Sequence, residues 1–353
     1  MSAVGISTSE LFKAMVCTLR KSLYLQHLFY SSQPKRVNER VVGKVVNVAI
    51  IGAPNSGKST LINNIVERKI CAASNKVHTT TKMIRAMYFQ NDTQIIFLDT
   101  PGVVSTKEQK KYKLPESMIA ACYKSLRCAN VVGVVHDVSN SYTKDVLHTD
   151  VVSMLKMVEE IPSFLIINKI DKLKSKKQLL TIIKNLTNGL IAGKSIPGTN
   201  KKREKPQLEL GYSKFSDVFL VSSLNGDGVS DVKEYLLSNA KPAAFHYKPD
   251  EWTDQTPELL VTEAVRAKFL DFLSQELPYH IKIELEYYEE REDKIICSLI
   301  AECPTERLVK LIRGAGGGRL QMISNHVRND LMDLFKKLVV VNIDLIAKEK
   351  NTE

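Results

Sequence analysis

The sequence lacks any uncharged apolar run near the roughly 18 residues that a transmembrane helix needs, so no integral membrane span is expected. It also lacks the cysteine and histidine spacings of metal sites. Its six scattered cysteines are typical of buried or free thiols in a reducing compartment. Glycine and proline are too few for a collagen. The 353 residues, 44% hydrophobic and 25% charged, predict a globular protein of two domains.

Acidic residues are scarce in two segments. Residues 1–36 carry five basic residues and one acid, and residues 172–206 carry ten basic residues and one acid. Residues 241–353 instead carry 16 basic and 20 acidic residues. The formal net charge of +11 therefore comes mainly from these two basic segments. It indicates an anionic partner but does not identify that partner.

Residues 1–43 are rich in serine, leucine and basic residues, which is typical of a mitochondrial transit peptide followed by a linker. No long apolar core of a secretory signal is present. A basic tail without a targeting role and an arm that contacts RNA are the two alternatives for this segment.

Short β-branched runs alternate with helical patterns between residues 44 and 242. Strands are expected at residues 44–52, 94–98, 131–138, 164–167 and 218–221, and helices at residues 58–68 and 145–158. This alternation predicts an α/β domain with a parallel-type central sheet.

The pattern changes after Pro242. Helices are expected at residues 258–275, 305–312 and 319–336, and strands at residues 280–287, 294–301 and 339–346. In the first of these strands, Ile281, Ile283, Leu285 and Tyr287 should share one face. The order αββααβ, with a glycine cluster at residues 314–318 between the last two helices, predicts a smaller α+β domain.

Residues 52–59 (GAPNSGKS) match the phosphate-binding pattern GxxxxGK[ST] between a predicted strand and a predicted helix. Glycines let backbone N–H groups approach phosphate oxygens, and the helix N-terminus favours the negative charge. Lys58 should reach the β- and γ-phosphates, and Ser59 should bind Mg²⁺. The nucleotide-binding residues expected in this loop are Gly52, Asn55, Ser56, Gly57, Lys58, Ser59 and Thr60.

Two further elements are expected around the γ-phosphate. Asp99 opens the sequence DTPG after a buried run, so its carboxylate should hold Mg²⁺ through water, and the Gly102 amide should bind the γ-phosphate. A threonine-rich loop lies between the two motifs. Thr80 is expected to bind Mg²⁺ and the γ-phosphate, with Thr79 as the alternative.

The sequence Asn168-Lys169-Ile170-Asp171 selects the base. The Asp171 carboxylate can accept two N–H bonds from guanine, a pair that adenine cannot offer, and such buried polar pairing discriminates steeply. Asn168 should bond the base and the loop, and Lys169 should lie over the purine. The remainder of the guanine pocket is expected from Ser222, Ser223 and Leu224. The predicted ligands are therefore GTP and GDP with Mg²⁺.

Together these motifs resemble the TrmE–Era branch of the TRAFAC GTPases. Residues 276–279 (ELPY), before the alternating strand, resemble Era, which carries a C-terminal type II KH domain. The resemblance spans residues 44–347, and with the basic N-terminus it is nearest to the mitochondrial Era-like GTPases of animals. It implies a GTPase domain at residues 44–242 with a basic insert at about 172–215, and a KH domain at residues 243–353.

The resemblance implies a catalytic set of Asn55, Lys58, Ser59, Thr80, Asp99 and Gly102. It implies GTP hydrolysis coupled to binding of small-subunit ribosomal RNA, during assembly of the mitochondrial small ribosomal subunit in the matrix, by a monomer. Asn55 would help to hold K⁺ near the phosphates. Val103, directly after DTPG, cannot hydrogen-bond a water, which predicts slow intrinsic hydrolysis.

Several alternatives stay open. The chain could be an RNA-binding module with a structural GTP site that does not turn over, or a GTPase acting on large-subunit RNA or tRNA. Peripheral association with the inner membrane is also open. The basic segment at residues 172–206, read as a loop from Pro197, Gly198 and Asn200, is either a solvated face or an auxiliary ribosomal RNA contact.

The glycine cluster fits the GxxG loop with which KH domains clamp nucleic-acid phosphates. Gly314–Gly317 match it, but the run is one residue longer than in the family and has no basic residue in the middle. The expected RNA-binding residues are Arg313, Gly314, Gly316, Gly317 and Arg319, with the arginines supplying charge from the flanks. A glycine turn that only caps a helix is the alternative.

Overall fold

The computed structural model describes residues 42–71, 84–100, 123, 125–173, 175–196, 211–274 and 277–348. The transit-peptide prediction up to residue 41 lies outside this range. So do four predictions on single residues, namely those for Thr79, Thr80, Gly102 and Val103. The loop markers Pro197, Gly198 and Asn200 and the first residue of ELPY, Glu276, also lie outside it.

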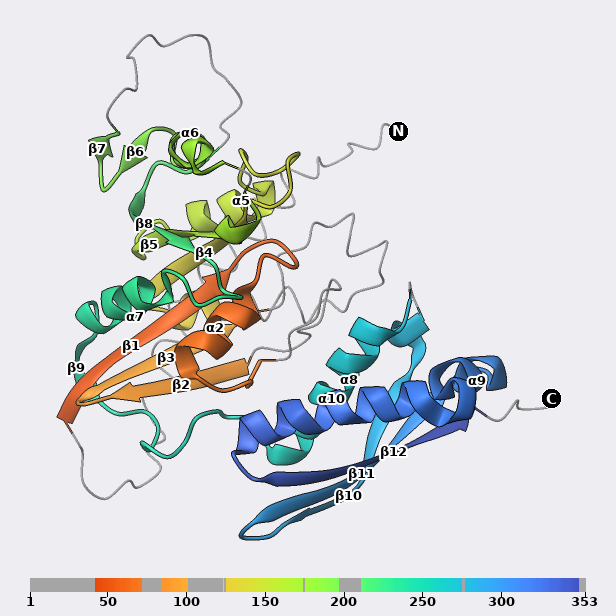
Figure 1. Cartoon of the computed structure of the whole chain (residues 1–353). Coiled ribbons are helices and arrows are strands. Elements are labelled where there is room, and N and C mark those ends of the chain that lie inside the picture. The colour runs from red at the N-terminus through yellow and green to blue at the C-terminus, as the bar shows by residue number, and fades with distance from the viewer. Residues whose placement is uncertain are drawn as a thin grey trace, which may run out of the picture. The chain divides into compact units, whose positions relative to one another are not determined.

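A seven-stranded mixed sheet forms the first half of the described chain (Figure 1). Its order is β2-β3-β1-β4-β5-β8, and β9 pairs with β1. The strands are β1 (Val42–Ile51), β2 (Ile84–Gln90), β3 (Thr93–Asp99), β4 (Val131–Asp137), β5 (Ser163–Asn168), β8 (Phe215–Val221) and β9 (Lys241–Ala244). The five strands expected from the sequence, β1, β3, β4, β5 and β8, are mutually parallel.

The two strands of this sheet that the sequence patterns did not predict, β2 and β9, are antiparallel additions at β3 and β1. β2 is joined to β3 by a tight turn in which Asn91 has a positive φ of 53°. A two-residue connection of this kind makes an antiparallel pair, whereas parallel neighbours need a long crossover. The alternation of strands and helices predicts only strands that are joined through helices. No helix lies between β2 and β3, so the alternation did not predict β2.

Helices cover both faces of the central sheet, which explains why its strands are continuous apolar runs. They are α2 (Lys58–Val66) and α7 (Val229–Ser238) on one face, and α5 (Thr149–Met157) and α6 (Leu179–Leu186) on the other. β1 serves both faces: Val46, Val48 and Ile50 belong to the first core, and Val45, Ala49 and Ile51 to the second.

Two expectations in this region were wrong. The helix expected at residues 145–158 begins only at Thr149. The residues before it form a turn that starts at Asn140, whose side-chain oxygen accepts a hydrogen bond from Tyr142 N at 3.0 Å. The basic segment is not one loop. Its described part holds α6, the short strands β6 (Leu190–Ile191) and β7 (Lys194–Ser195) and single turns of 3-10 helix, because α6 buries an apolar face in the second core.

A three-stranded sheet and three helices form the rest of the described chain (Figure 1). The elements are α8 (Pro257–Phe272), β10 (Lys282–Glu290), β11 (Lys294–Cys303), α9 (Glu306–Arg313), α10 (Gly318–Phe335) and β12 (Leu338–Ala347). This is the predicted order αββααβ. The buried residues of β11 alternate along the strand and pack against the helices.

One detail of this sheet differs from the expectation. The pairing of β10 with β11 shifts by one residue between Leu285 and Tyr287, which is a β-bulge. Because a one-residue shift turns the following side chains to the other face, Tyr287 is exposed and Tyr288 packs on the core instead.

The connection between the two sheets lies along the edge strand β2. Met87 N donates to Trp252 O at 3.0 Å, Thr253 Oγ1 donates to Arg85 O at 2.9 Å, and Arg85 pairs with Asp254 at 2.9 Å. Val42–Glu353 forms one compact unit, and a domain boundary at residue 242 stays a prediction. In the described part of the chain, every helix is too short or too polar to cross a bilayer.

Candidate nucleotide-binding site

The predicted nucleotide motifs meet at one edge of the central sheet. The phosphate loop follows β1, Asp99 ends β3, Asn168 ends β5, and Ser222 follows β8. These strands are parallel, so their carboxyl ends share an edge, where α/β proteins hold their ligands.

The phosphate loop has a conformation that requires glycine at both ends. Gly57 caps α2 with a φ of 97°, and a Cβ there would lie 2.2 Å from Asn168 Nδ2. A Cβ at Gly52 would lie 2.3 Å from Val135 O. Lys58 is buried, and its Nζ donates to Gly52 O at 3.2 Å and to Ala53 O at 3.1 Å. The loop therefore curls tightly around an ammonium group at the start of a helix, which is a cradle for phosphate.

Two oxygen donors suited to a divalent cation lie beside this cradle. Ser59 Oγ donates to Asp99 Oδ2 at 2.9 Å. Asp99 is completely buried and its Oδ1 has no hydrogen-bond partner. Burial raises the pKa of this carboxyl, although Lys58 and the hydrogen bond from Ser59 act against the rise. A hydroxyl and a carboxylate are ligands that Mg²⁺ takes together with substrate phosphates, so these residues fit the metal.

Asn168 links the loop at residues 168–171 to the phosphate loop and to the loop after β8. Its Nδ2 donates to Ser56 O at 2.8 Å, and its Oδ1 accepts from Ser223 N at 2.9 Å. Lys169 has a positive φ of 64°, and its Nζ donates to Asn55 O at 2.7 Å. The side chains expected to read the base therefore brace the phosphate loop as well.

Asp171 is positioned by the last predicted motif, because Ser222 Oγ donates to Asp171 Oδ1 at 2.6 Å. Ser223 Oγ is buried without a hydrogen-bond partner, and Leu224 is 76% exposed. The structure thus brings every described residue of the predicted site to one edge. Their contacts with GTP stay predictions.

The sequence reasoning missed Asp137, the last residue of β4. Its Oδ2 accepts from Lys169 Nζ at 2.6 Å, so Lys169 bridges Asp137 and the phosphate loop. Burial would raise the pKa of Asp137, but hydrogen bonds from Lys169 and Ser139 lower it overall. Asp137 could have been found from the sequence, because it is a carboxylate at the end of a buried strand. The same pattern identified Asp99.

We expect Asp137→Asn to weaken GTP and GDP binding by about 10-fold, because a charge-assisted hydrogen bond contributes about 1.5–3 kcal/mol and the amide replaces only part of it. Titration of each nucleotide with the full chain measures the loss. Asp217→Asn, on the amino-terminal half of β8, is the matched control. An affinity equal to that of the wild type would contradict the positioning role of Asp137.

The glycine loop forms a second candidate site between α9 and α10. Gly314, Gly316 and Gly317 have positive φ angles of 73°, 58° and 80°. A Cβ at Gly316 or Gly317 would meet no atom within 4 Å, so this backbone is open to an approaching group. Arg319 folds back on α9, where one of its guanidinium nitrogens donates to Leu311 O at 3.1 Å.

Within the described residues, no cluster of three histidine, cysteine, aspartate or glutamate side chains could hold a metal on its own. The cysteines described there, Cys71, Cys128, Cys297 and Cys303, are all free thiols.

A phosphate loop, a Ser59–Asp99 oxygen pair and an Asn-Lys-x-Asp loop at the carboxyl edge of a mostly parallel sheet define a P-loop GTPase.

Comparisons with known proteins agree. The family model of the 50S ribosome-binding GTPases matches residues 47–169. The mitochondrial GTPase Era of Danio rerio is 35% identical over 325 residues, which cover 83% of this chain and 73% of the relative. The chain belongs to the Era family of GTPases.

Solved Era structures share the fold. One is Era in complex with MgGDPNP and nucleotides 1506–1542 of 16S ribosomal RNA, with a TM-score of 0.69 and 24% identity. The other is an Aquifex aeolicus Era variant bound to GDP·AlF4⁻, with a TM-score of 0.70 and 24% identity. Each match covers 87% of this chain and 95% of the solved one, so the likeness includes both sheets.

Proposed function

We propose that this chain is a GTP-hydrolysing switch that binds small-subunit ribosomal RNA and assists assembly of the mitochondrial small ribosomal subunit. The observation that carries the proposal is the presence, on one Era-family chain, of a phosphate loop beside an Asn-Lys-x-Asp loop and of an open glycine loop. The mitochondrial name of the Danio rerio relative supports the compartment, and the solved Era complex with 16S ribosomal RNA supports the class of RNA. We place the protein in the matrix as a monomer.

The nucleotide site would act by positioning and by neutralising charge, which phosphoryl transfer needs more than covalent chemistry. The phosphate-loop amides and Lys58 would bind the β- and γ-phosphates. Asp171 would accept the guanine N–H groups, and the backbone near Ser223 would bind the guanine carbonyl. Mg²⁺, held by Ser59 and through water by Asp99, would supply positive charge against the phosphate oxygens. Thr80 and Gly102 would complete the γ-phosphate contacts.

Potassium is proposed as a further cofactor, held beside the phosphates with help from Asn55. Asn55 has a positive φ of 60° and is fixed to Lys169 through its backbone oxygen, so it occupies a defined place in the phosphate loop. We expect GTP hydrolysis to be at least about 10-fold faster in K⁺ than in Na⁺, since a cation there does part of the work of an arginine finger. Equal rates of phosphate release in the two salts would exclude this role.

The glycine loop is the proposed contact with the RNA backbone. The C-terminal part of the chain is net acidic, so binding must rest on the local amides of Gly314–Gly317 and on Arg313 and Arg319 rather than on bulk charge. We expect Gly317→Asp to weaken RNA binding by about 10-fold or more through repulsion of phosphates, without changing GTP affinity.

Gly193→Asp is the matched control for this variant. Gly193 also has a positive φ, of 74°, and a Cβ there would also meet nothing within 4 Å, but it lies in the β6–β7 turn. Binding of a labelled 16S ribosomal RNA 3′ fragment measures the difference. Gly193 also lies within the basic segment at residues 172–206, the other candidate RNA contact, so equal losses in both variants would contradict the assignment of the glycine loop as the specific contact with the RNA backbone.

The alternatives make different predictions. A structural GTP site would give no phosphate release in a single-turnover assay, with or without RNA. A GTPase acting on large-subunit RNA or tRNA would be found on those molecules when RNA crosslinked to the full chain in mitochondria is sequenced. Recovery of small-subunit ribosomal RNA is the outcome that the proposal requires.

A further inference from the structure

A fixed corner follows the helix that carries Lys58 and Ser59. α2 ends at Val66, and Glu67 reverses the chain with a positive φ of 59°. Asn63 of α2 then holds Cys71 twice: its Oδ1 accepts from Cys71 N at 2.8 Å and its Nδ2 donates to Cys71 O at 2.8 Å. Residues 68–70 are therefore pinned at both ends to the nucleotide-binding helix.

Arg68 projects from this corner onto the C-terminal end of α10. One of its guanidinium nitrogens donates to Leu334 O at 2.9 Å, a carbonyl of the last helical turn, which has no partner within the helix. The guanidinium also lies over the Trp252 ring, 5.3 Å from its centroid. Trp252 in turn meets Phe335 edge to face, with centroids 6.1 Å apart. Arg68 is thus held by the helix end and by the connection between the two sheets.

Lys69 binds the same end of α10 through charge. Its Nζ lies 2.8 Å from Asp330 and 3.0 Å from Asp333, one turn apart on the helix. Lys268 of α8 lies 2.6 Å from the other oxygen of Asp330. Burial alone would lower the pKa of Lys69, but its hydrogen bonds to the two aspartates raise it overall, so the amine stays charged at neutral pH.

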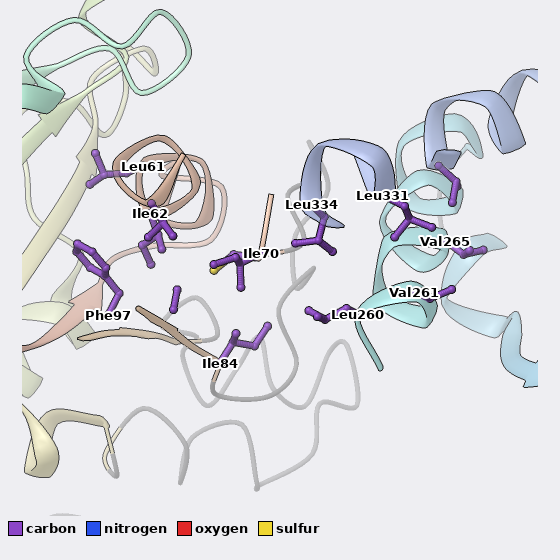
Figure 2. Close-up of a cluster of buried hydrophobic side chains, with 14 of the residues drawn as sticks. Leu61, Ile62, Ile70, Ile84, Phe97, Leu260, Val261, Val265, Leu331 and Leu334 are labelled. Carbon is purple, nitrogen blue, oxygen red and sulfur yellow. The ribbon is translucent and has the colours of Figure 1, made fainter. Parts of the chain in front are cut away.

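Apolar contacts run beneath these polar ones (Figure 2). Ile70 and Ile84 lie between Leu61 and Ile62 of α2 on one side and Leu260 and Leu334 on the other, and all belong to one buried cluster. The core of the nucleotide-binding face is therefore continuous with the core under α8 and α10.

α10 connects this contact with the proposed RNA site. Its 18 residues make a helix about 27 Å long. The last two turns hold Asp330, Asp333 and Leu334, and the N-terminal end begins at the glycine loop. One continuous helix thus joins the residues that meet the corner after α2 to the loop proposed to meet phosphate.

We propose that Arg68 and Lys69 are positioning residues that couple the nucleotide site to the glycine loop through α10. The inference rests on the proposed function. A shift of α2 between GTP- and GDP-bound forms moves the corner at residues 68–70, and the corner carries α10 with it. Coupling of this kind is reciprocal: the nucleotide changes RNA affinity by the same factor by which RNA changes nucleotide affinity.

The test measures that factor in the full chain. The affinity for an RNA equivalent to nucleotides 1506–1542 of 16S ribosomal RNA is determined with GDPNP and with GDP. Wild-type protein should give affinities that differ by about 5-fold or more, the lower end of typical allosteric coupling. Lys69→Glu and Asp333→Lys should each bring the ratio to about 2 or less, and the double variant, which restores the pair with reversed charge, should restore the ratio.

A second readout needs no RNA. Trp252 is the only tryptophan in the chain, so tryptophan fluorescence reports on the surroundings of this one ring, which include Arg68 and Phe335. Exchange of GDP for GDPNP should change the emission of the wild type and the double variant, but not that of either single variant. Lys44→Glu, which breaks the exposed pair of Lys44 with Asp92, is the control and should behave as the wild type.

The outcomes separate this inference from the proposed function. Absence of RNA or GDPNP binding by wild-type protein would remove the proposed function itself. If both ligands bind and the affinity ratio is close to 1, the coupling role of Arg68 and Lys69 is overturned. If the single variants keep the wild-type ratio and fluorescence change, the coupling role of Lys69 is overturned. Loss of the ratio in both single variants with rescue in the double variant supports it.

Discussion

Asp171→Asn should exchange a preference for GTP for a preference for xanthosine triphosphate. Ser222 Oγ donates to Asp171 Oδ1 at 2.6 Å, so the carboxylate is held in place by the loop that follows β8. Guanine offers two N–H donors to a carboxylate, whereas xanthine replaces one of them with a carbonyl oxygen. An asparagine amide can accept from one position and donate to the other, so it complements xanthine and leaves a guanine donor unpaired.

The expected change in the ratio of the two affinities is on the order of 10⁴-fold, the size found where a site built for a polar partner meets an analogue that lacks it. Competition binding with GTP, xanthosine triphosphate and ATP measures it. Asp231→Asn, at the exposed start of α7, removes the same charge outside the site and should change nothing. If Asp171→Asn protein still prefers GTP, the assignment of the base-reading residue is wrong.

The residues of the nucleotide site were predictable because their geometry follows from parallel strands. A buried run that stops at Gly52, Asp99 or Asn168 places those residues at one sheet edge whatever the rest of the fold does. The αββααβ order was predictable for a similar reason: each element has a clear period, and the caps Thr256 and Thr305 accept backbone hydrogen bonds at the starts of α8 and α9.

The features that were missed depend on contacts between distant segments. The β-bulge that exposes Tyr287 changes the pairing with β11, and no period within β10 reveals it. Lys69 and Asp330 are 261 residues apart in the sequence, and each alone is an ordinary surface charge. Asp137 could have been predicted as a carboxylate at the end of a buried strand. It was missed because its partner Lys169 was expected only to contact the base.

Asp99→Asn should make the protein without nucleotide more stable and its Mg²⁺-dependent reaction much slower. Asp99 is completely buried, with Oδ1 unpartnered, and burial raises the pKa of its carboxyl above the ordinary 3.8. A carboxyl with a raised folded-state pKa contributes stability that is present below its unfolded pKa and lost as the pH rises through the folded value. An amide carries no charge and can still accept the hydrogen bond from Ser59, so the variant avoids this loss.

Thermal unfolding without nucleotide should therefore show that Asp99→Asn melts a few degrees higher than wild type near pH 7, with the difference shrinking as the pH falls toward 4. Mg²⁺ affinity in the presence of GTP should fall by about 10–100-fold, as when other residues that hold a metal through a bound group are replaced. Asp92→Asn, which alters an exposed carboxylate at the opposite end of β3, should change neither property.

Melting below wild type at every pH would contradict the inference that burial of the Asp99 carboxyl lowers the stability of the fold. Unchanged Mg²⁺ affinity would exclude its metal role. Both expected results together would mean that the fold keeps an unfavourable buried carboxylate at this strand end because the nucleotide reaction requires it.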